Sequence, residues 1–384
     1  MPISDNPSKQ APYKLLALDG GGIRGIITIE VLGEIERVLQ EKLGAGDDFT
    51  LARYFDYIAG TSTGAVIATC LSLGMRVSEI RRFYLESAEL MFEKASLLKR
   101  LHHKFEDEPL AGKLRKVFSE KTGEDNPTLG SAGLQTLLMM VLRNATTDSP
   151  WTISNNPAAK YNCPTDRPGC NLALPLWQVV RASTAAPVYF PPESIDVGAQ
   201  QFIFVDGGVT MYNNPAFQLF LMATVEPYNL RWKTRGPEDM LLVSIGTGTS
   251  PQPNGKLDPD QMNLLFNASA IPSALMFAAL NEQDFLCRVF GKCLEGDPLD
   301  REIGSMVDGS GAHGSSGPLE QKLFTYVRYN AELSKPGLAQ LEIHDIEPEH
   351  VQKLDSVKYK GELQRVGAAV AKTKVKASHF EGFR

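Results

Sequence analysis

The segment DGGGIRG at residues 19–25 follows the apolar run KLLAL at 14–18 and precedes a long stretch with recurring apolar side chains. The apolar run predicts a short buried strand. The recurrence, every three or four residues, predicts an amphipathic helix that ends near Gly44. Glycine permits the tight turn between the two elements. This strand–loop–helix unit is the building block of a parallel sheet covered by helices.

The rest of the chain extends this pattern. YFDYIA at 54–59 predicts a second buried strand, which runs into GTSTG at 60–64 and then into an apolar helix at 65–73. Further strands are predicted at 137–142, 202–205, 240–245 and 324–329, and further helices at 77–120, 175–186, 261–294 and 349–376. A Gly- and Ser-rich stretch at 301–319 predicts a surface loop. We therefore expect an α/β domain over residues 1–255 and a helical C-terminal extension, 256–384, packed on the same domain.

Composition narrows the functional classes. The chain has 384 residues, of which 43% are hydrophobic and 22% charged, with a net charge of −6. This balance predicts a folded globular protein, and its mild acidity argues against broad nucleic-acid binding. The short polar N-terminus and the lack of a long apolar run predict a cytoplasmic protein.

The five cysteines show no metal-binding pattern. Cys163 and Cys170 are expected to be reduced surface thiols, with a bridge between them left open. The acidic stretch 258–263 lacks the glycine and the closing glutamate of a calcium loop. We expect no metal and no cofactor.

The glycine segment permits two functional interpretations. Gly20, Gly22 and Gly25 satisfy GxGxxG, which is typical of dinucleotide-binding proteins. The acidic ribose partner of such proteins should end a second strand, but Glu36 and Glu41 fall inside the first predicted helix. Alternatively, the backbone amides of the loop form an oxyanion hole.

GTSTG at 60–64 fits the Gly-x-Ser-x-Gly nucleophile elbow. In that turn the serine lies between a strand and a helix, and its neighbours need to be small so that nothing obstructs it. The pentapeptide alone is a weak signal, since ordinary strand-to-helix turns use the same residue types. Its position after a buried strand makes Ser62 a candidate nucleophile.

A serine nucleophile needs a base, and Asp206 is the best placed candidate. It directly follows the apolar strand 202–205, and the glycines at 207 and 208 leave space beside it. An aspartate in such a loop also often caps a turn. None of the histidines follows a predicted core strand; they are His102, His103, His313, His344, His350 and His379.

Together these segments resemble the patatin-like phospholipase family. The resemblance rests on blocks in a fixed order: DGGGIRG at 19–25, GTSTG at 60–64, RASTAAPVYF at 181–190, DGG at 206–208 continuing through Asn213-Asn214-Pro215, and SIGTGT at 244–249. Their joint occurrence in this order is highly specific.

The resemblance implies a three-layer fold with a mostly parallel central sheet and hydrolysis of lipid acyl esters by a Ser–Asp dyad. Ser62 would be the nucleophile and Asp206 the base, with its pKa raised by partial burial. Gly20, Gly21 and Gly22 would form the oxyanion loop. The residues expected to support them are Arg24, Thr63 and Gly207.

Several expectations concern partners and regulation. The basic, leucine-containing segment 94–105 is a candidate for transient contact with a membrane surface, although an ordinary amphipathic helix has the same pattern. Oligomerisation is possible in principle. A dinucleotide-dependent oxidoreductase and a phospholipase effector with low basal activity, switched on by a signal molecule, remain as alternatives.

Overall fold

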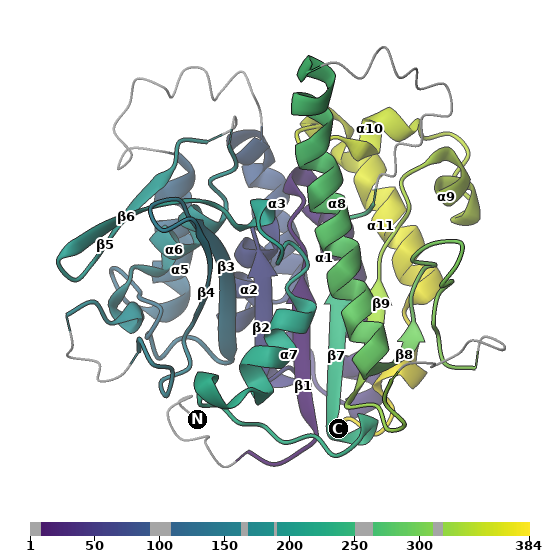
Figure 1. The fold of residues 1–384 in the computed structure, drawn as a ribbon, viewed down its shortest axis with the longest axis horizontal. Helices are drawn as coiled ribbons and strands as arrows, with labels where there is room; N and C mark the ends of the chain where they lie inside the picture. The colour runs from purple at the N-terminus through teal and green to yellow at the C-terminus, as the bar shows by residue number, and fades with distance from the viewer. Residues whose placement is uncertain (1–8, 93–108, 163–167, 188–189, 250–263, 310–317) are drawn as a thin grey trace.

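The computed structural model describes residues 9–92, 109–162, 168–187, 190–249, 264–309 and 318–384, with no side-chain description for 264–273. A nine-stranded sheet runs through the centre of these residues (Figure 1). Its order is β5-β6-β3-β2-β1-β7-β9-β8, and β4 pairs with β3 beside this path. The five pairings from β3 to β8 along this order are parallel, whereas β4, β5 and β6 form antiparallel pairs. The predicted α/β class with a mostly parallel sheet is confirmed.

The strands are β1 (Tyr13–Leu18), β2 (Tyr57–Thr61), β3 (Leu137–Asn144), β4 (Ser149–Ser154), β5 (Glu193–Val197), β6 (Gln200–Asp206), β7 (Met240–Ile245), β8 (Gly291–Glu295) and β9 (Phe324–Tyr329). The helices are α1 (Gly25–Leu43), α2 (Thr63–Ser72), α3 (Val77–Phe92), α5 (Pro109–Thr122), α6 (Leu176–Ser183), α7 (Ala216–Thr224), α8 (Leu264–Phe290), α9 (Lys335–Gln340), α10 (Pro348–Gln352) and α11 (Lys360–Lys374). Short 3-10 turns connect several of them.

Alternation along the strands builds two apolar cores, one on each face of the sheet. In β1, Leu16 and Leu18 join a core covered by α1, α2, α3, α6 and α11. Leu15 and Ala17 point the other way, into a smaller core covered by α7 and the C-terminal part of α8. Since successive side chains of a strand alternate, one fully buried strand serves both cores. The result is a three-layer fold, with α7 and α8 in front of the sheet in Figure 1.

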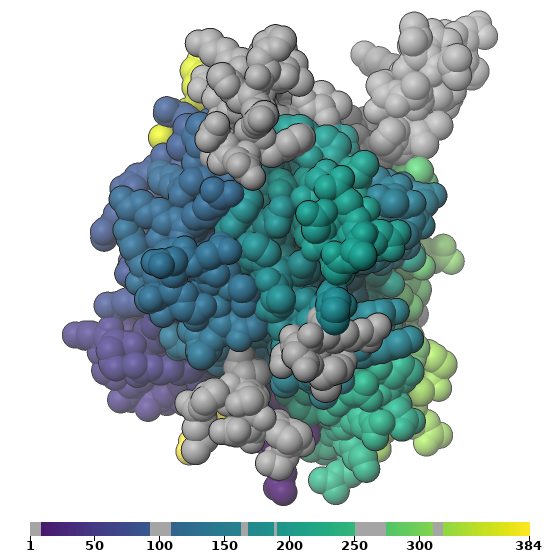
Figure 2. Space-filling model, turned by 90° about the vertical axis from the view of Figure 1, so that its left-hand side faces the viewer, coloured from purple at the N-terminus to yellow at the C-terminus, as the bar shows by residue number. Residues whose placement is uncertain are grey.

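The antiparallel strands form one edge of the molecule. Figure 2 shows this edge, where blue residues between 109 and 150 and teal residues near 200 share the surface. β6 pairs with the end of β3, so that Leu142 lies opposite Asp206. The pairing therefore places the last residue of β6 near the carboxyl ends of the parallel strands, where β1 and β2 also end.

The described C-terminal residues contain strands as well as helices, and the strand predicted at 324–329 is present as β9. These residues contribute β8 and β9 to the central sheet, and α11 packs along α1. The predicted helix 349–376 is interrupted between Gln352 and Lys360. Strands β4, β5 and β8 were not predicted, since their half-exposed sequences lack a long apolar run.

Two further expectations can be compared with the described residues. The predicted helix 77–120 is seen as α3 and α5, and the residues between them lie outside the description. In the described chain, no helix has both the length and the apolarity to cross a bilayer.

Candidate active site

Ser62 lies in a sharp turn between β2 and α2. Its backbone has φ 53° and ψ −121°, a conformation that residues other than glycine rarely adopt. A β-carbon at Gly60 would approach the Gly64 carbonyl oxygen to 2.1 Å, and one at Gly64 would approach the Leu18 carbonyl oxygen to 2.3 Å. Both glycines of the pentapeptide are therefore required by close backbone contacts.

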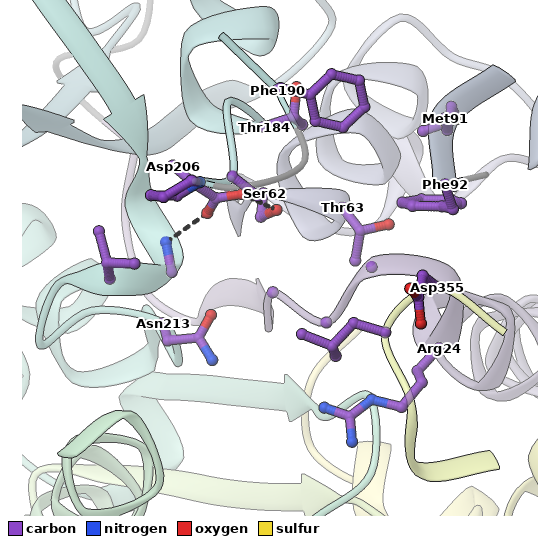
Figure 3. A pocket seen from close by; sticks show the side chains of 18 of the residues that line it. Arg24, Ser62, Thr63, Met91, Phe92, Thr184, Phe190, Asp206, Asn213 and Asp355 are labelled. Carbon is purple, nitrogen blue, oxygen red and sulfur yellow. Dashed lines mark hydrogen bonds between the residues drawn. The ribbon is translucent and has the colours of Figure 1, made fainter. Parts of the chain in front are cut away.

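The Ser62 hydroxyl donates a hydrogen bond to Asp206, with 2.6 Å between Oγ and Oδ2 (Figure 3). The other carboxylate oxygen, Oδ1, accepts the Gly208 amide at 2.6 Å. Asp206 is 5% exposed. Two residues that are 144 positions apart in the chain thus meet directly, with the carboxylate held by its own turn.

Burial changes the chemistry of this carboxylate. Desolvation raises the pKa of Asp206 to about 6, while hydrogen bonds from Ser62 and Gly208 and the positive charge of Arg181 act in the opposite direction. A carboxylate with a pKa near 6 is a better proton acceptor than an ordinary aspartate and is still ionised at neutral pH.

The glycine loop lies beside this pair. A β-carbon at Gly20 would come within 3.2 Å of the Ser62 β-carbon. The three glycines are not equivalent as donors, because the Gly20 amide donates to the Asn213 carbonyl oxygen at 3.1 Å. Gly22 begins a 3-10 turn, so its amide has no acceptor within that turn. In the described residues, the loop amides left to face a ligand are those of Gly21 and Gly22.

The three predicted supporting residues each have a distinct structural position. Arg24 donates to the Gln352 carbonyl oxygen at 3.3 Å, and burial lowers its pKa to about 10 despite the nearby Asp19. The Thr63 hydroxyl bonds to Tyr84. A β-carbon at Gly207 would meet the Val141 carbonyl oxygen at 2.2 Å.

A cavity of about 240 Å³ opens above the serine and aspartate. Its walls are mainly apolar, and Figure 3 shows Phe92 and Phe190 on the same side of the pocket as Met91. The lining residues come from distant parts of the chain, and those beyond residue 220 are Met276, Leu354 and Asp355. The pocket can therefore hold an apolar chain next to the Ser62 hydroxyl.

Other candidate residues lie elsewhere. The described histidines, His344, His350 and His379, do not line the pocket. His379 bonds to Tyr329, and His350 bonds to Glu362. His102, His103 and His313, as well as the segments 94–105 and 258–263, lie outside the described residues.

The thiol prediction needs a correction. Cys170 is a buried free thiol that donates to the Asn162 carbonyl oxygen at 3.4 Å, so it is not a surface residue. Its position in a loop between polar residues gave no sign of burial. Cys163 lies outside the described residues. Among the described residues, no group of three potential ligands could hold a metal ion.

Sequence reasoning missed several residues that shape the site. Ser183 accepts the Ser62 amide at 3.0 Å and donates to the Val141 carbonyl oxygen. The Tyr84 hydroxyl donates to the Gly22 carbonyl oxygen at 2.6 Å, which connects α3 to the glycine loop. Ser183 stands in the block 181–190, so a signal for it existed, whereas nothing in its helical context distinguished Tyr84.

The described fold and pocket define an α/β protein with an elbow serine and a buried aspartate at the base of an apolar cavity. Comparison with known families makes the assignment specific. The sequence model of the patatin-like phospholipase family matches residues 16–220, and this chain belongs to that family.

Known relatives agree with this assignment. The chain is 30% identical over 249 residues to an intracellular phospholipase A2 of Caenorhabditis elegans, covering 63% of this chain and 20% of that protein. It is 28% identical to patatin-like protein 1 of Arabidopsis thaliana, covering 76% and 77%, respectively. It is 31% identical to a cGAMP-activated phospholipase of Vibrio cholerae, covering 53% and 56%.

The chain therefore spans only part of some relatives, and a fifth of the Caenorhabditis elegans protein. Among solved structures, VipD from Legionella pneumophila aligns with 92% of this chain and 67% of its own, at 16% identity and a TM-score of 0.38. At that score the likeness adds nothing to the assignment, which depends on the sequence match.

Proposed function

We propose that this protein is a lipid acyl hydrolase, of the phospholipase A or lysophospholipase type, with Ser62 as nucleophile and Asp206 as base. The observation that carries the proposal is the 2.6 Å hydrogen bond from the Ser62 hydroxyl to Asp206 at the base of an apolar cavity. The apolar walls suit a fatty-acyl chain, and the ester carbonyl would lie between Ser62 and the glycine loop.

In the first step, the Ser62 oxygen bonds to the ester carbonyl carbon while its proton passes to Asp206. The carbonyl oxygen becomes an oxyanion, which the amides of Gly21 and Gly22 stabilise. When the tetrahedral species collapses, the bond to the leaving alcohol breaks and the alcohol takes the proton from Asp206. An acyl-enzyme remains.

In the second step, Asp206 accepts a proton from water as the water oxygen attacks the acyl carbon. The Ser62 oxygen then leaves, recovers the proton and releases the fatty acid. The raised pKa of Asp206 supports this double role, because proton transfer in both directions is easiest when the pKa lies near the working pH.

Hydrolysis of a nitrophenyl acyl ester and of phosphatidylcholine vesicles tests the proposal. We expect Ser62→Ala to lower kcat by at least about 1000-fold, and Asp206→Asn to act similarly, because the two groups work as a unit. The matched controls are Ser87→Ala, a buried serine that bonds within α3, and Asp345→Asn, a surface aspartate paired with Arg365. Full activity in either dyad variant would disprove the mechanism.

The dinucleotide hypothesis has no support in the site. Glu36 lies inside α1, where its carboxylate accepts the Val77 amide, and Glu41 lies near the end of the same helix. Activation by a signal molecule, membrane contact and oligomerisation remain predictions. A jump from a near-zero basal rate on addition of a cyclic dinucleotide, as the name of the Vibrio cholerae relative suggests, would support the regulated form.

A further inference from the structure

We propose that Thr247, in the segment SIGTGT at 244–249, is a positioning residue that aims the Gly21 amide at the oxyanion. The inference rests on the proposed function and gives a role to a segment that lies outside the family match at 16–220. This segment begins in the last two residues of β7 and continues beyond it, and β7 pairs in parallel register with β1. The glycine loop and the SIGTGT segment therefore leave the sheet side by side.

The key contact is between the Thr247 side chain and the peptide group that joins Gly20 to Gly21. The Thr247 hydroxyl donates to the Gly20 carbonyl oxygen at 3.0 Å. In a trans peptide, the carbonyl and the following N–H point in opposite directions. A hydroxyl that holds the Gly20 carbonyl on one side of the loop therefore turns the Gly21 N–H toward the other side.

The two sides of the glycine loop face different surroundings. Thr247 is 2% exposed and does not line the cavity, whereas Gly20, Gly21 and Gly22 do. We infer that the threonine lies on the side of the loop away from the cavity, and that the opposite side faces the cavity lined by Ser62.

Packing fixes the same peptide group. A β-carbon at Gly21 would lie 2.0 Å from the Thr247 oxygen and 2.5 Å from the Thr247 β-carbon. Glycine at this position lets the threonine approach closely enough to bond to the preceding carbonyl. The next peptide group is held separately, because the Gly21 carbonyl oxygen accepts the Arg24 amide at 3.2 Å.

The residues on either side of Thr247 are held by contacts that do not involve the three glycines. The Gly248 amide donates to the Asn330 side chain at 2.9 Å, and the Thr28 hydroxyl donates to the Gly246 carbonyl oxygen at 3.1 Å. These contacts hold the backbone on both sides of Thr247. Removing its hydroxyl should therefore release the Gly20–Gly21 peptide group while the segment itself stays in place.

The test compares Thr247→Val, which keeps the shape and removes the hydroxyl, with Thr247→Ser, which keeps the hydroxyl. We expect Thr247→Val to lower kcat by about 10- to 100-fold with little change in KM, because the donor acts mainly in the transition state. Thr247→Ser should stay within about threefold of wild type. The control is Thr325→Val, a buried threonine that donates to the Pro237 carbonyl oxygen at the opposite end of the sheet and should leave kcat unchanged.

A second readout separates positioning from a general structural effect. An alkyl trifluoromethyl ketone adds to the Ser62 oxygen and places a negative oxygen where the ester oxyanion forms. Its affinity should fall in Thr247→Val by the same factor as kcat/KM, while the affinity for a free fatty alcohol of equal chain length should not change. The inference is overturned if Thr247→Val keeps wild-type kcat and ketone affinity, or if Thr247→Ser is equally impaired.

Failure of the proposed function gives a different result. A wild-type protein that neither hydrolyses the esters nor forms the ketone adduct would overturn both proposals. An active wild type with an equally active Thr247→Val would overturn this inference alone.

Discussion

The first 220 residues and those after 240 make different contributions to the site. The first region supplies Ser62, Asp206 and the glycine loop. The second region supplies Thr247 and Arg328, which bond to residues of this loop, and Leu354, which lines the cavity. The family match over 16–220 therefore includes the proposed catalytic residues. It does not include all the residues that hold the glycine loop in position.

Arg328 illustrates how the second region supports the first. Its guanidinium group, on β9, makes a bidentate ion pair with Asp19, the residue that leads into the glycine loop. One of its nitrogens also donates to Ser244 at 2.7 Å. The side chains of Arg328 and Asp19 are 1% and 0% exposed. A fixed charge pair at this depth holds the start of the loop against two other strands.

Among the variants that test whether the first region depends on the second, Arg328→Gln should have the largest effect on stability. The variant leaves the Asp19 carboxylate buried without its cation, and removing one partner of such a pair typically costs about 4 kcal/mol. We expect the free energy of unfolding, measured by urea denaturation, to fall by about that amount. Activity at low temperature should also fall, because the loop loses its anchor.

The control for this variant is Arg365→Gln, which breaks a bidentate pair with Asp345 on the surface. Solvent screens that pair, so its loss should change stability little. Equal stabilities of the two variants would show that the first region does not depend on Arg328.

The sequence predicted one region better than the other, for physical reasons. The glycine loop, the elbow and Asp206 follow apolar strands and are short in sequence, so local patterns reveal them. Thr247 and Arg328 act across 227 and 309 positions of the chain, on residues that are identified only once the strand order is known. No local periodicity encodes that order.

The same reason explains which strands the sequence analysis failed to predict. The parallel strands β1, β2 and β7 were predicted because they are continuously apolar. The strands β5 and β8 are only partly buried, and their sequences resemble those of loops. The helix predicted over 261–294 also included most of β8, which is a strand paired with β9 in the central sheet.

A smaller effect tests whether the two regions unfold together. Leu363, on α11, is fully buried, and a β-carbon at Gly367 on the same helix would lie 2.9 Å from the Ile27 α-carbon in α1. Leu363→Ala should lower the free energy of unfolding by about 3 kcal/mol, as expected for a buried leucine. If the chain unfolds as one unit, tryptophan fluorescence and far-UV circular dichroism should report the same midpoint.

The three tryptophans, Trp151, Trp177 and Trp232, all precede residue 240, whereas α11 belongs to the second region. A variant in α11 that shifts their fluorescence transition must act on residues that precede the second region. Leu43→Ala, at the half-exposed end of α1, is the control and should cost much less. Separate transitions by the two probes would divide the molecule into independent units and contradict the packing of α11 on α1.

The last effect concerns two buried aspartates. Asp19 forms an ion pair with Arg328, whereas the charge of Arg181 is the smallest of the influences on the pKa of Asp206. Desolvation raises the pKa of Asp206 to about 6 in the folded protein, from 3.8 in an unfolded chain. The folded state therefore holds a proton between these pH values that the unfolded state releases. Stability contributed by the protonated form is present below pH 3.8 and is lost as the pH rises through 6.

The predicted cost of ionising Asp206 is about 3 kcal/mol above pH 6, and Asp206→Asn should abolish this part of the pH dependence. Activity should follow the opposite trend, because only the carboxylate accepts the Ser62 proton. We expect kcat/KM to rise about tenfold per pH unit below 6 and to level off above it. Stability and activity that both decline below pH 6 would show that the folded protein stabilises Asp206 as a carboxylate and would contradict the raised pKa of this group. The proposed active site would then contain a carboxylate that burial does not destabilise.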